Sequence, residues 1–187
     1  DFSDSIIVAS NALGLFKSTN FGVTYQSIDI SYPTNLYISK IFVKGNTIIL
    51  GMEDQNNANY DVYMSTDGGD SWYTPPTLAG KRVKDFASSS NQIYVLTNAG
   101  IYKTINNGLT WVHLGLPDNS TNKIACYEDV VYAADNRALG SIWKKDGMSG
   151  SWIKISGNLP SSGMRSISAN ANFFFALTSN GIFRTGN

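Results

Sequence analysis

Short runs of apolar and β-branched residues recur along the chain and are separated by polar, glycine-rich stretches. Typical runs are Thr47–Leu50 and Gln92–Leu96, each about as long as one strand and bounded by Gly, Asn or Pro. No segment keeps an apolar face at helical spacing over three turns. The pattern therefore predicts an all-β protein made of short antiparallel strands.

Aromatic residues mark a repeat. One set stands at steps of 47, 39, 41 and 40 residues: Phe16, Tyr63, Tyr102, Trp143 and Phe183. A second aromatic follows each of the first four after a gap of nine residues: Tyr25, Trp72, Trp111 and Trp152. A constant gap inside a drifting period indicates a rigid local unit joined by loops of variable length.

Four short antiparallel strands in each unit of about 40 residues are typical of a β-propeller blade. We predict a single domain over residues 1–187 with blades at about 1–30, 38–75, 82–114, 122–156 and 164–187. This is a β-propeller of about five four-stranded blades whose terminal blades are incomplete, since the first strand is a stub at 1–3 and the last blade has three strands. Two arrangements stay open: an imperfectly closed five-bladed ring, or a piece of a larger propeller completed by another chain.

A polar, glycine-rich turn lies between the two aromatics of each repeat. The clearest covers residues 65–72 and follows the Asp-box pattern, Ser/Thr-x-Asp-x-Gly-x-Ser/Thr-Trp. We assign to such turns Ser65, Asp67, Gly69, Ser71 and Trp72; Asn106, Gly108, Thr110 and Trp111; Asn20, Gly22, Thr24 and Tyr25; and Trp152 of a degenerate fourth turn. The Asp or Asn side chain is expected to accept hydrogen bonds from backbone N–H groups, and Gly to allow a positive φ. We predict a structural role for them; the alternative is a carboxylate site for a metal or for catalysis.

These turns resemble those of the Asp-box, or bacterial neuraminidase repeat, propellers, and the repeats carry the resemblance over essentially the whole chain. The resemblance implies the fold and places the turns away from the ligand-binding face. It implies no single function, because the group includes sialidases, xyloglucan-active glycosidases, receptors and assembly factors. Sialidases need three arginines around the substrate carboxylate, and this chain has four arginines in all: Arg82, Arg137, Arg165 and Arg184. Candidate carboxylates for a glycosidase lie in loops: Glu53, Asp54, Asp118 and Asp135.

Charge and composition remove several classes of function. Fourteen basic and fourteen acidic residues give a formal net charge of zero, which argues against a general nucleic-acid binder and a polybasic membrane anchor. No apolar run approaches the roughly 20 residues that span a bilayer, so no membrane insertion is expected. Cys126 is the single cysteine and His113 the single histidine; we interpret them as a small apolar core residue and a rim residue. No cofactor and no metal site are predicted.

Basic residues recur where the innermost strand of each blade is predicted to begin. Lys40, Lys84, Lys123 and Arg165 follow one another at steps of 44, 39 and 42 residues. A ring of such groups at a channel mouth would focus positive potential on an anionic partner, whereas isolated solvated charges would only cap strands. Tyr32 and Tyr37, in a long loop, are the other candidate ligand-binding residues: they either stack on a sugar or peptide or fill the space left by the loop.

From the sequence we expect a non-enzymatic binding or scaffolding propeller that recognises a protein or glycan partner, in an extracellular or periplasmic location. One alternative is a glycosidase-like propeller, or a fragment of one. The other is an engineered or fragment propeller that self-associates through its incomplete terminal blades, because exposed strand edges pair readily.

The basic positions give a first testable prediction. Replacing Lys84 and Lys123 together by Ala should weaken binding of a polyglutamate peptide severalfold, because half of the predicted ring is removed. Titration of the labelled peptide at low salt measures the effect. Unchanged affinity in the double variant would contradict the ring.

Overall fold

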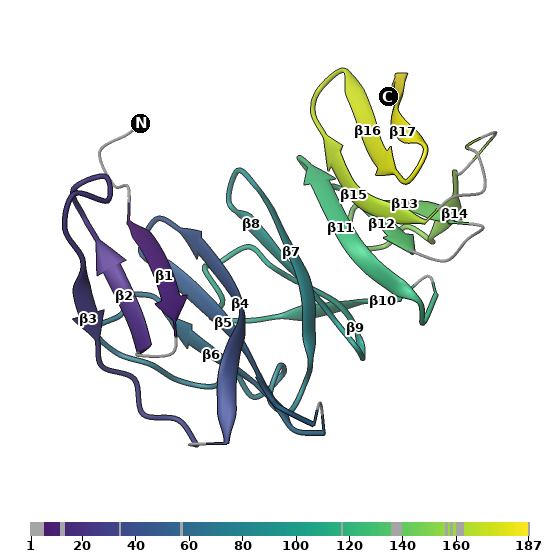
Figure 1. The fold of residues 1–187 in the computed structure, drawn as a ribbon. Coiled ribbons are helices and arrows are strands. Elements are labelled where there is room, and N and C mark those ends of the chain that lie inside the picture. Colours follow the sequence, from purple (N-terminus) through teal and green to yellow (C-terminus); the bar gives the residue numbers. More distant parts are fainter. Residues whose placement is uncertain are drawn as a thin grey trace. The chain divides into compact units, whose positions relative to one another are not determined.

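The computed structural model describes residues 6–11, 14–33, 35–56, 58–116, 118–135, 140–155, 157, 159 and 163–186. The described strands form five antiparallel sheets of three or four strands, and each sheet follows chain order (Figure 1). This confirms the all-β prediction and is consistent with propeller blades. The chain divides into two units, residues 1–83 and 84–187.

The first unit holds two three-stranded sheets. Their strands are β1 (Ile7–Asn11), β2 (Gly14–Ser18) and β3 (Gln26–Ile28), then β4 (Leu36–Lys44), β5 (Thr47–Asp54) and β6 (Tyr60–Ser65). Every residue of β5 is buried, as expected for a central strand covered on both faces. Ile48, Leu50 and Met52 face the first sheet, where Leu15 and Ile28 pack against them.

The second unit holds three sheets. The four-stranded ones consist of β7 (Val83–Ser89), β8 (Gln92–Thr97), β9 (Gly100–Thr104) and β10 (Val112–Gly115), and of β11 (Thr121–Tyr127), β12 (Val130–Asp135), β13 (Ile142–Asp146) and β14 (Ile153–Lys154). The last consists of β15 (Met164–Ala169), β16 (Phe173–Thr178) and β17 (Gly181–Gly186). In the described part of the chain, β17 is therefore an edge strand.

Side-chain alternation explains how the sheets of the second unit stack. Along β12, Val131 and Ala133 pack against the preceding sheet, and Tyr132 and Ala134 pack against the following one. A strand that buries both sets of alternate side chains must lie between two other layers. The ring of Tyr132 lies 4.8 Å from that of Phe174, measured between centroids, which joins β12 to β16.

The predicted strands are present with one clear exception. The blade predicted at 38–75 was expected to have four strands but has three, because residues 71–73 make only an isolated bridge between Met64 and Tyr73. Pro75 and Pro76 follow at once, and proline has no N–H to continue a ladder. The stub predicted at 1–3 lies outside the described residues.

A β-bulge recurs in the first strand of several sheets. The pairing of β4 with β5 shifts between Ile38 and Lys40, that of β11 with β12 between Thr121 and Lys123, and that of β15 with β16 between Met164 and Ser166. Each bulge inserts one residue and re-aims the side chains before it. Lys40 and Lys123 therefore follow a bulge, while Arg165 lies in one.

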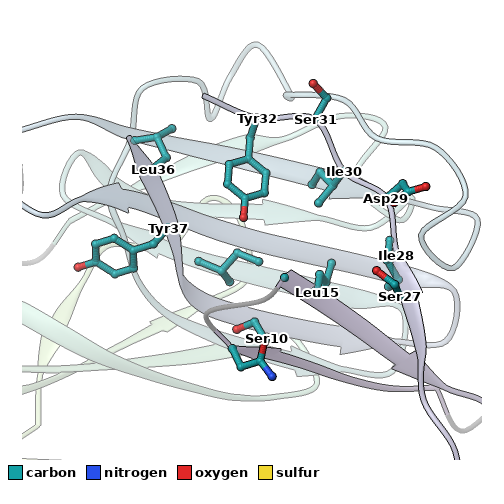
Figure 2. A pocket seen from close by; sticks show the side chains of 13 residues that line it. Ser10, Leu15, Ser27, Ile28, Asp29, Ile30, Ser31, Tyr32, Leu36 and Tyr37 are labelled. Carbon is teal, nitrogen blue, oxygen red and sulfur yellow. The ribbon is translucent and has the colours of Figure 1, made fainter. Parts of the chain in front are cut away.

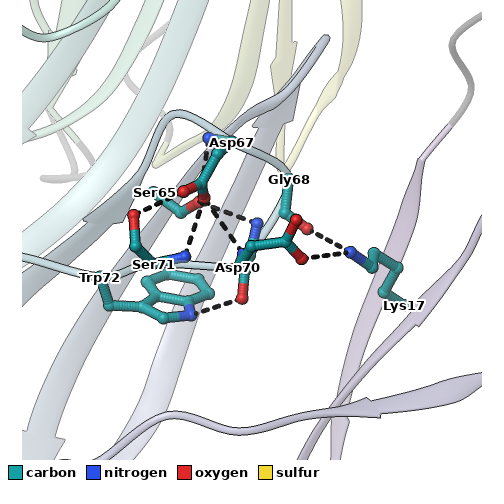
Figure 3. Close-up of polar contacts among 8 residues, drawn as sticks. Lys17, Ser65, Asp67, Gly68, Asp70, Ser71 and Trp72 are labelled. Atoms are coloured by element: carbon teal, nitrogen blue, oxygen red, sulfur yellow. Dashed lines mark hydrogen bonds and ion pairs between the residues drawn. The ribbon is translucent and has the colours of Figure 1, made fainter.

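The turn at 65–72 is held by its own side chains (Figure 3). Asp67 Oδ1 accepts hydrogen bonds from Ser71 N at 2.9 Å, Asp70 N at 3.1 Å and Ser65 Oγ at 2.7 Å, and Oδ2 accepts one from Ser71 Oγ. These hydrogen bonds hold the pKa of Asp67 well below its usual range. Gly69 has a φ of 97°, which favours glycine, and Trp72 Nε1 donates to its carbonyl at 3.0 Å.

The turns at 18–25 and 104–111 repeat this arrangement with an amide. Asn20 Oδ1 accepts from Thr24 N at 3.0 Å, and Asn106 Oδ1 accepts from Thr110 N at 3.0 Å. Gly22 N and Gly108 N each donate at 2.9 Å to the hydroxyl that opens the turn. Because the neutral amide makes these bonds too, the closure of the turns requires no negative charge.

Two lysines connect neighbouring sheets within the units. Lys17 of β2 donates to Gly68 O at 2.8 Å and lies 3.3 Å from Asp70 Oδ1, which joins the first sheet to the turn at 65–72 (Figure 3). Lys103 of β9 lies 2.9 Å from Asp129 Oδ1 in the β11–β12 turn. The Lys103 side chain is only 4% exposed, so its ammonium depends on this carboxylate.

The turn at 65–72 gives a second prediction. Asp67→Ala should lower the free energy of unfolding by about 1 kcal/mol, because the lost hydrogen bonds are exposed and compete with water. Asp67→Asn should cost less, as Asn20 and Asn106 close equivalent turns. Urea unfolding at pH 7 measures both variants, and equal losses would contradict the proposed hydrogen-bond geometry.

The same carboxyl predicts a pH dependence. Because the pKa of Asp67 is lower in the folded state, its contribution is complete above the unfolded-state pKa of about 3.9 and is lost as the pH falls toward the folded-state value. Stability of Asp67→Asn should therefore fall less than that of the parent between pH 5 and pH 2. Parallel curves for the two proteins would contradict this.

Candidate functional site

A cavity of about 880 Å³ lies in the first unit. The residues that line it come from the end of β1, the start of β2, the end of β3 with the segment that follows, and the start of β4 (Figure 2). They are Ser10, Asn11, Gly14, Leu15, Ser27, Ile28, Asp29, Ile30, Ser31, Tyr32, Leu36, Tyr37 and Ile38. Its size is within the range of small-ligand sites. The lining combines buried aliphatic side chains with hydroxyl and amide groups.

Strand pairing brings these residues together. Leu15 pairs with Ile28 across β2 and β3, which forms an apolar floor of two buried side chains. Tyr37 pairs with Glu53 across β4 and β5. Glu53 pairs with Tyr60 at the start of β6, whereas the turn at 65–72 begins at the other end of that strand. The cavity and this turn therefore lie at opposite ends of the strands.

The two candidate tyrosines lie differently in the cavity. In Figure 2 the Tyr32 hydroxyl points toward the group of lining side chains, and the Tyr37 hydroxyl points away from it. Tyr32 also packs edge-on against Tyr63, with ring centroids 6.4 Å apart and an interplanar angle of 62°. Tyr37 is 43% exposed and therefore offers a ring face to solvent at the cavity rim.

A polar cluster adjoins this rim. Arg82 Nε lies 2.9 Å from Glu53 Oε2, and the Arg82 guanidinium lies 5.6 Å from the Tyr60 ring centroid. Burial, the negative charge of Glu53 and a hydrogen bond to Glu53 raise the pKa of Tyr37, while the charge of Arg82 acts in the opposite direction. From the sequence, Glu53 was only a candidate carboxylate in a loop, and its contacts with Arg82 and Tyr37 were not predicted. The one indication in the sequence was an acid directly after the buried run 47–52.

The other three acids were also expected in loops, but only Asp118 lies in one; Asp54 and Asp135 are the last residues of β5 and β12, and Glu53 is also in β5. Asp54 accepts from Ala58 N at 2.8 Å and Asn59 Nδ2 at 2.6 Å, and these bonds lower its pKa. Asp118 Oδ1 accepts from Ser120 N at 2.8 Å. Asp135 is 1% exposed and follows the buried run of β12. These carboxylates are arranged as turn and strand-end groups.

The structure places the predicted basic residues in unequal settings. Lys84 donates from Nζ to Thr121 O at 2.9 Å and to Asn119 O at 3.3 Å. Lys123 is half-buried and Arg165 is exposed, and the bulges put Arg165 one residue out of register with Lys123. Lys40 is exposed and belongs to the first unit. The ring of the four stays a prediction.

The remaining singled-out residues lie in sheets or turns. His113 is exposed on β10 and stacks on Tyr102 at 4.8 Å between centroids. Cys126 is half-buried and packs against the core between the first two sheets of the second unit. Tyr25 is 47% exposed, and Trp111 is half-buried. Arg137 lies outside the described residues.

Neither a metal-binding cluster nor a membrane-spanning helix occurs among the described residues. No three of their His, Cys, Asp and Glu side chains gather closely enough to hold a metal ion. Within the same residues, no helix is long and apolar enough to cross a membrane.

Residues 33–173 match the DUF6242 beta propeller domain. The chain belongs to this family. The match confirms the propeller prediction for the DUF6242 domain, for which no specific function is established. No curated protein sequence is significantly similar to the domain.

Solved structures support the same fold. An ancestral GH74 enzyme is 20% identical, with a TM-score of 0.72 over 97% of this chain. YCF48 bound to D1 peptide is 15% identical, with a TM-score of 0.65 over 91% of this chain. Both are propellers of the BNR/Asp-box type. This chain spans 29% of the GH74 chain and 57% of the YCF48 chain. The computationally designed Ika4 protein is 11% identical, with a TM-score of 0.65. The match covers 86% of this chain and 98% of the Ika4 chain. At these identities the likeness shows the fold alone.

The rim cluster gives a third prediction. Burial is the largest cause of the raised pKa of Tyr37 and remains in Glu53→Gln, but the variant removes the negative charge of Glu53 that raises it further, so the pKa should fall part of the way toward 10. Ultraviolet titration of tyrosinate, or NMR of the labelled ring carbon, measures the shift. Asp61→Asn is the matched control, since Asp61 raises the pKa of Tyr63 instead. A Tyr37 pKa that is the same in parent and Glu53→Gln would contradict the assignment.

Proposed function

We propose that this member of the DUF6242 propeller family is a non-enzymatic binding propeller of the Asp-box type that recognises a glycan or protein partner at the cavity of its first unit. The cavity of about 880 Å³ with Tyr32 and Tyr37 at its side and rim carries the proposal. The turns at 18–25, 65–72 and 104–111 are the Asp boxes in this interpretation and act as structural closures. An extracellular or periplasmic location belongs to the same proposal.

The chemistry of the lining supports binding of a neutral, hydroxyl-rich or peptide-like group. Leu15 and Ile28 supply an apolar floor, and the hydroxyls of Ser27, Ser31 and Tyr32 supply donors and acceptors. Sites of this kind combine an apolar surface with a few placed polar groups that fix orientation. The exposed ring of Tyr37 adds a flat surface of low conformational entropy, which suits stacking on a sugar or peptide.

The lining favours binding over glycoside hydrolysis. Most glycosidases place two carboxyl groups across the scissile bond, about 5–9.5 Å apart. Among the described lining residues only Asp29 carries a carboxylate. Glu53 lies beside the cavity but is paired with Arg82. The likeness to a GH74 enzyme concerns the fold, so it adds no catalytic residue to this site.

Binding arrays test this proposal. The labelled domain is applied to arrays of neutral oligosaccharides and of peptides, and the strongest ligand is then measured by calorimetry. Tyr37→Ala should weaken that ligand about 10-fold or more, because it removes an aromatic anchor. Asp29→Asn should change affinity in the same direction for a ligand that donates hydrogen bonds.

Tyr25→Ala is the matched control, because Tyr25 is similarly exposed but belongs to a turn. Mass spectrometry of the ligand after incubation should show it intact. Either a ligand whose affinity is indifferent to Tyr37 and Asp29, or the absence of any ligand on both arrays, would refute the site. Release of a hydrolysed product would replace the proposal by the glycosidase alternative.

A further inference from the structure

The second sheet extends further at one end than two of its counterparts. The hairpins β8–β9 and β16–β17 turn back directly after the pairs Thr97–Gly100 and Thr178–Gly181, each two pairs beyond the repeat aromatic. The equivalent pair in the hairpin β5–β6 is Met52–Asp61. Here the strands do not turn back but continue, and β4 continues beside them. The added residues belong to this sheet alone and are not part of the repeat.

The extension brings three side chains into one row. Glu53 of β5 lies opposite Tyr37 of β4 and opposite Tyr60 of β6. Residues directly opposite on neighbouring strands point to the same face of a sheet. The Tyr37 hydroxyl donates a hydrogen bond to Glu53. The row therefore presents a carboxylate between two aromatic rings.

A glycine brings Arg82 onto this row. A Cβ at Gly51 would lie only 2.8 Å from Val83 Cβ, so the chain that leads into β7 comes this close to β5 only at a glycine. The equivalent positions of the three later sheets carry side chains: Leu96, Ala134 and Leu177. Arg82 directly precedes Val83 and places Nε 2.9 Å from Glu53 Oε2. Its guanidinium lies 5.6 Å from the Tyr60 ring centroid.

The cluster offers no unpaired charge to a ligand. The charges that act on Tyr37 are those of Glu53, Arg82 and Asp54. Asp54 is 6% exposed and its carboxylate is held by Ala58 N at 2.8 Å. The Arg82 side chain is 41% exposed but is already paired with Glu53. A carboxylate ligand would meet two acids beside this guanidinium, and an ammonium ligand would meet the guanidinium itself.

We propose that Glu53 and Arg82 make the ligand site selective for a neutral glycan, an inference that rests on the proposed function of the cavity. Tyr37 lines the cavity and its hydroxyl points away from the other lining side chains, so the bond to Glu53 fixes the ring before a ligand arrives (Figure 2). A pyranose has a rigid, flat face that stacks on such a ring. Its hydroxyls donate and accept without a charge, which suits a guanidinium beside a carboxylate.

An array in which only the charge varies tests the proposal. It carries β-linked hexasaccharides of glucose, mannose and galactose, the same compounds oxidised at C6 to carboxylates, and their 6-amino counterparts. We expect the labelled protein to bind a neutral compound about 10-fold or more tightly than its charged counterparts, because each charge meets a like charge. Tighter binding of a charged form, or no binding of any neutral compound, would overturn the proposal.

Variants of the pair should move this preference in opposite directions. Glu53→Gln leaves Arg82 without its acid, so the ratio of neutral to carboxylate affinity should fall about fivefold, the effect of one unit charge at about 4 Å in water. Arg82→Gln should raise the ratio by a similar factor. Asp70→Asn is the matched control: it makes the same change of charge at a side chain 78% exposed, in the turn at the other end of the sheet. A structural role alone would weaken all compounds equally and leave the ratio unchanged.

The outcomes separate this inference from the proposed function. A neutral glycan that depends on Tyr37, with a charge preference that neither Glu53→Gln nor Arg82→Gln shifts, would overturn the inference alone. Binding restricted to peptides would do the same. Absence of any ligand among these compounds and the peptides would remove the proposed function as well. Circular dichroism checks folding, and the remaining variant decides the matter if the other unfolds.

Discussion

The fold depends on covering the inner strands of the sheets on both faces. All of β5 is buried, and β12 divides its side chains between two separate apolar clusters. A sheet with such a strand cannot face water on either side without exposing aliphatic surface, which costs about 25 cal/mol for each Å². Side-by-side stacking of sheets is the response. The outer strands, the turns and the lysine contacts between sheets are arranged around that requirement.

The sequence predicted the parts of this arrangement that are local. Apolar runs located the strands, and the nine-residue gap between aromatics located the turns, because both reflect contacts within one repeat. Prediction failed at 71–73, where only an isolated bridge forms before two prolines. The bulges place Arg165 one residue out of register with Lys123, an offset that equal spacing along the chain does not reveal. Counting along the chain cannot detect a bulge, since no residue type requires one.

The candidate site shows the same division. Tyr32 and Tyr37 were recognisable as aromatic residues in a long polar loop. The contact between Glu53 and Arg82 joins positions 29 residues apart and depends on where β5 ends and how the chain returns, which no local pattern records. At the other end of the same sheet, Asp67 and its neighbours satisfy one another. At both ends charged groups are held by contacts within the first unit, and the cavity end adds the exposed ring of Tyr37.

The division of the β12 side chains between two apolar clusters has a consequence for the history of the chain. Within the second unit, the middle sheet packs one face against the sheet before it and the other face against the sheet after it. A duplicated or deleted stretch of about 40 residues therefore creates a junction that already fits. Change in whole repeats requires no simultaneous redesign of the core, whereas an insertion of a few residues within a strand does.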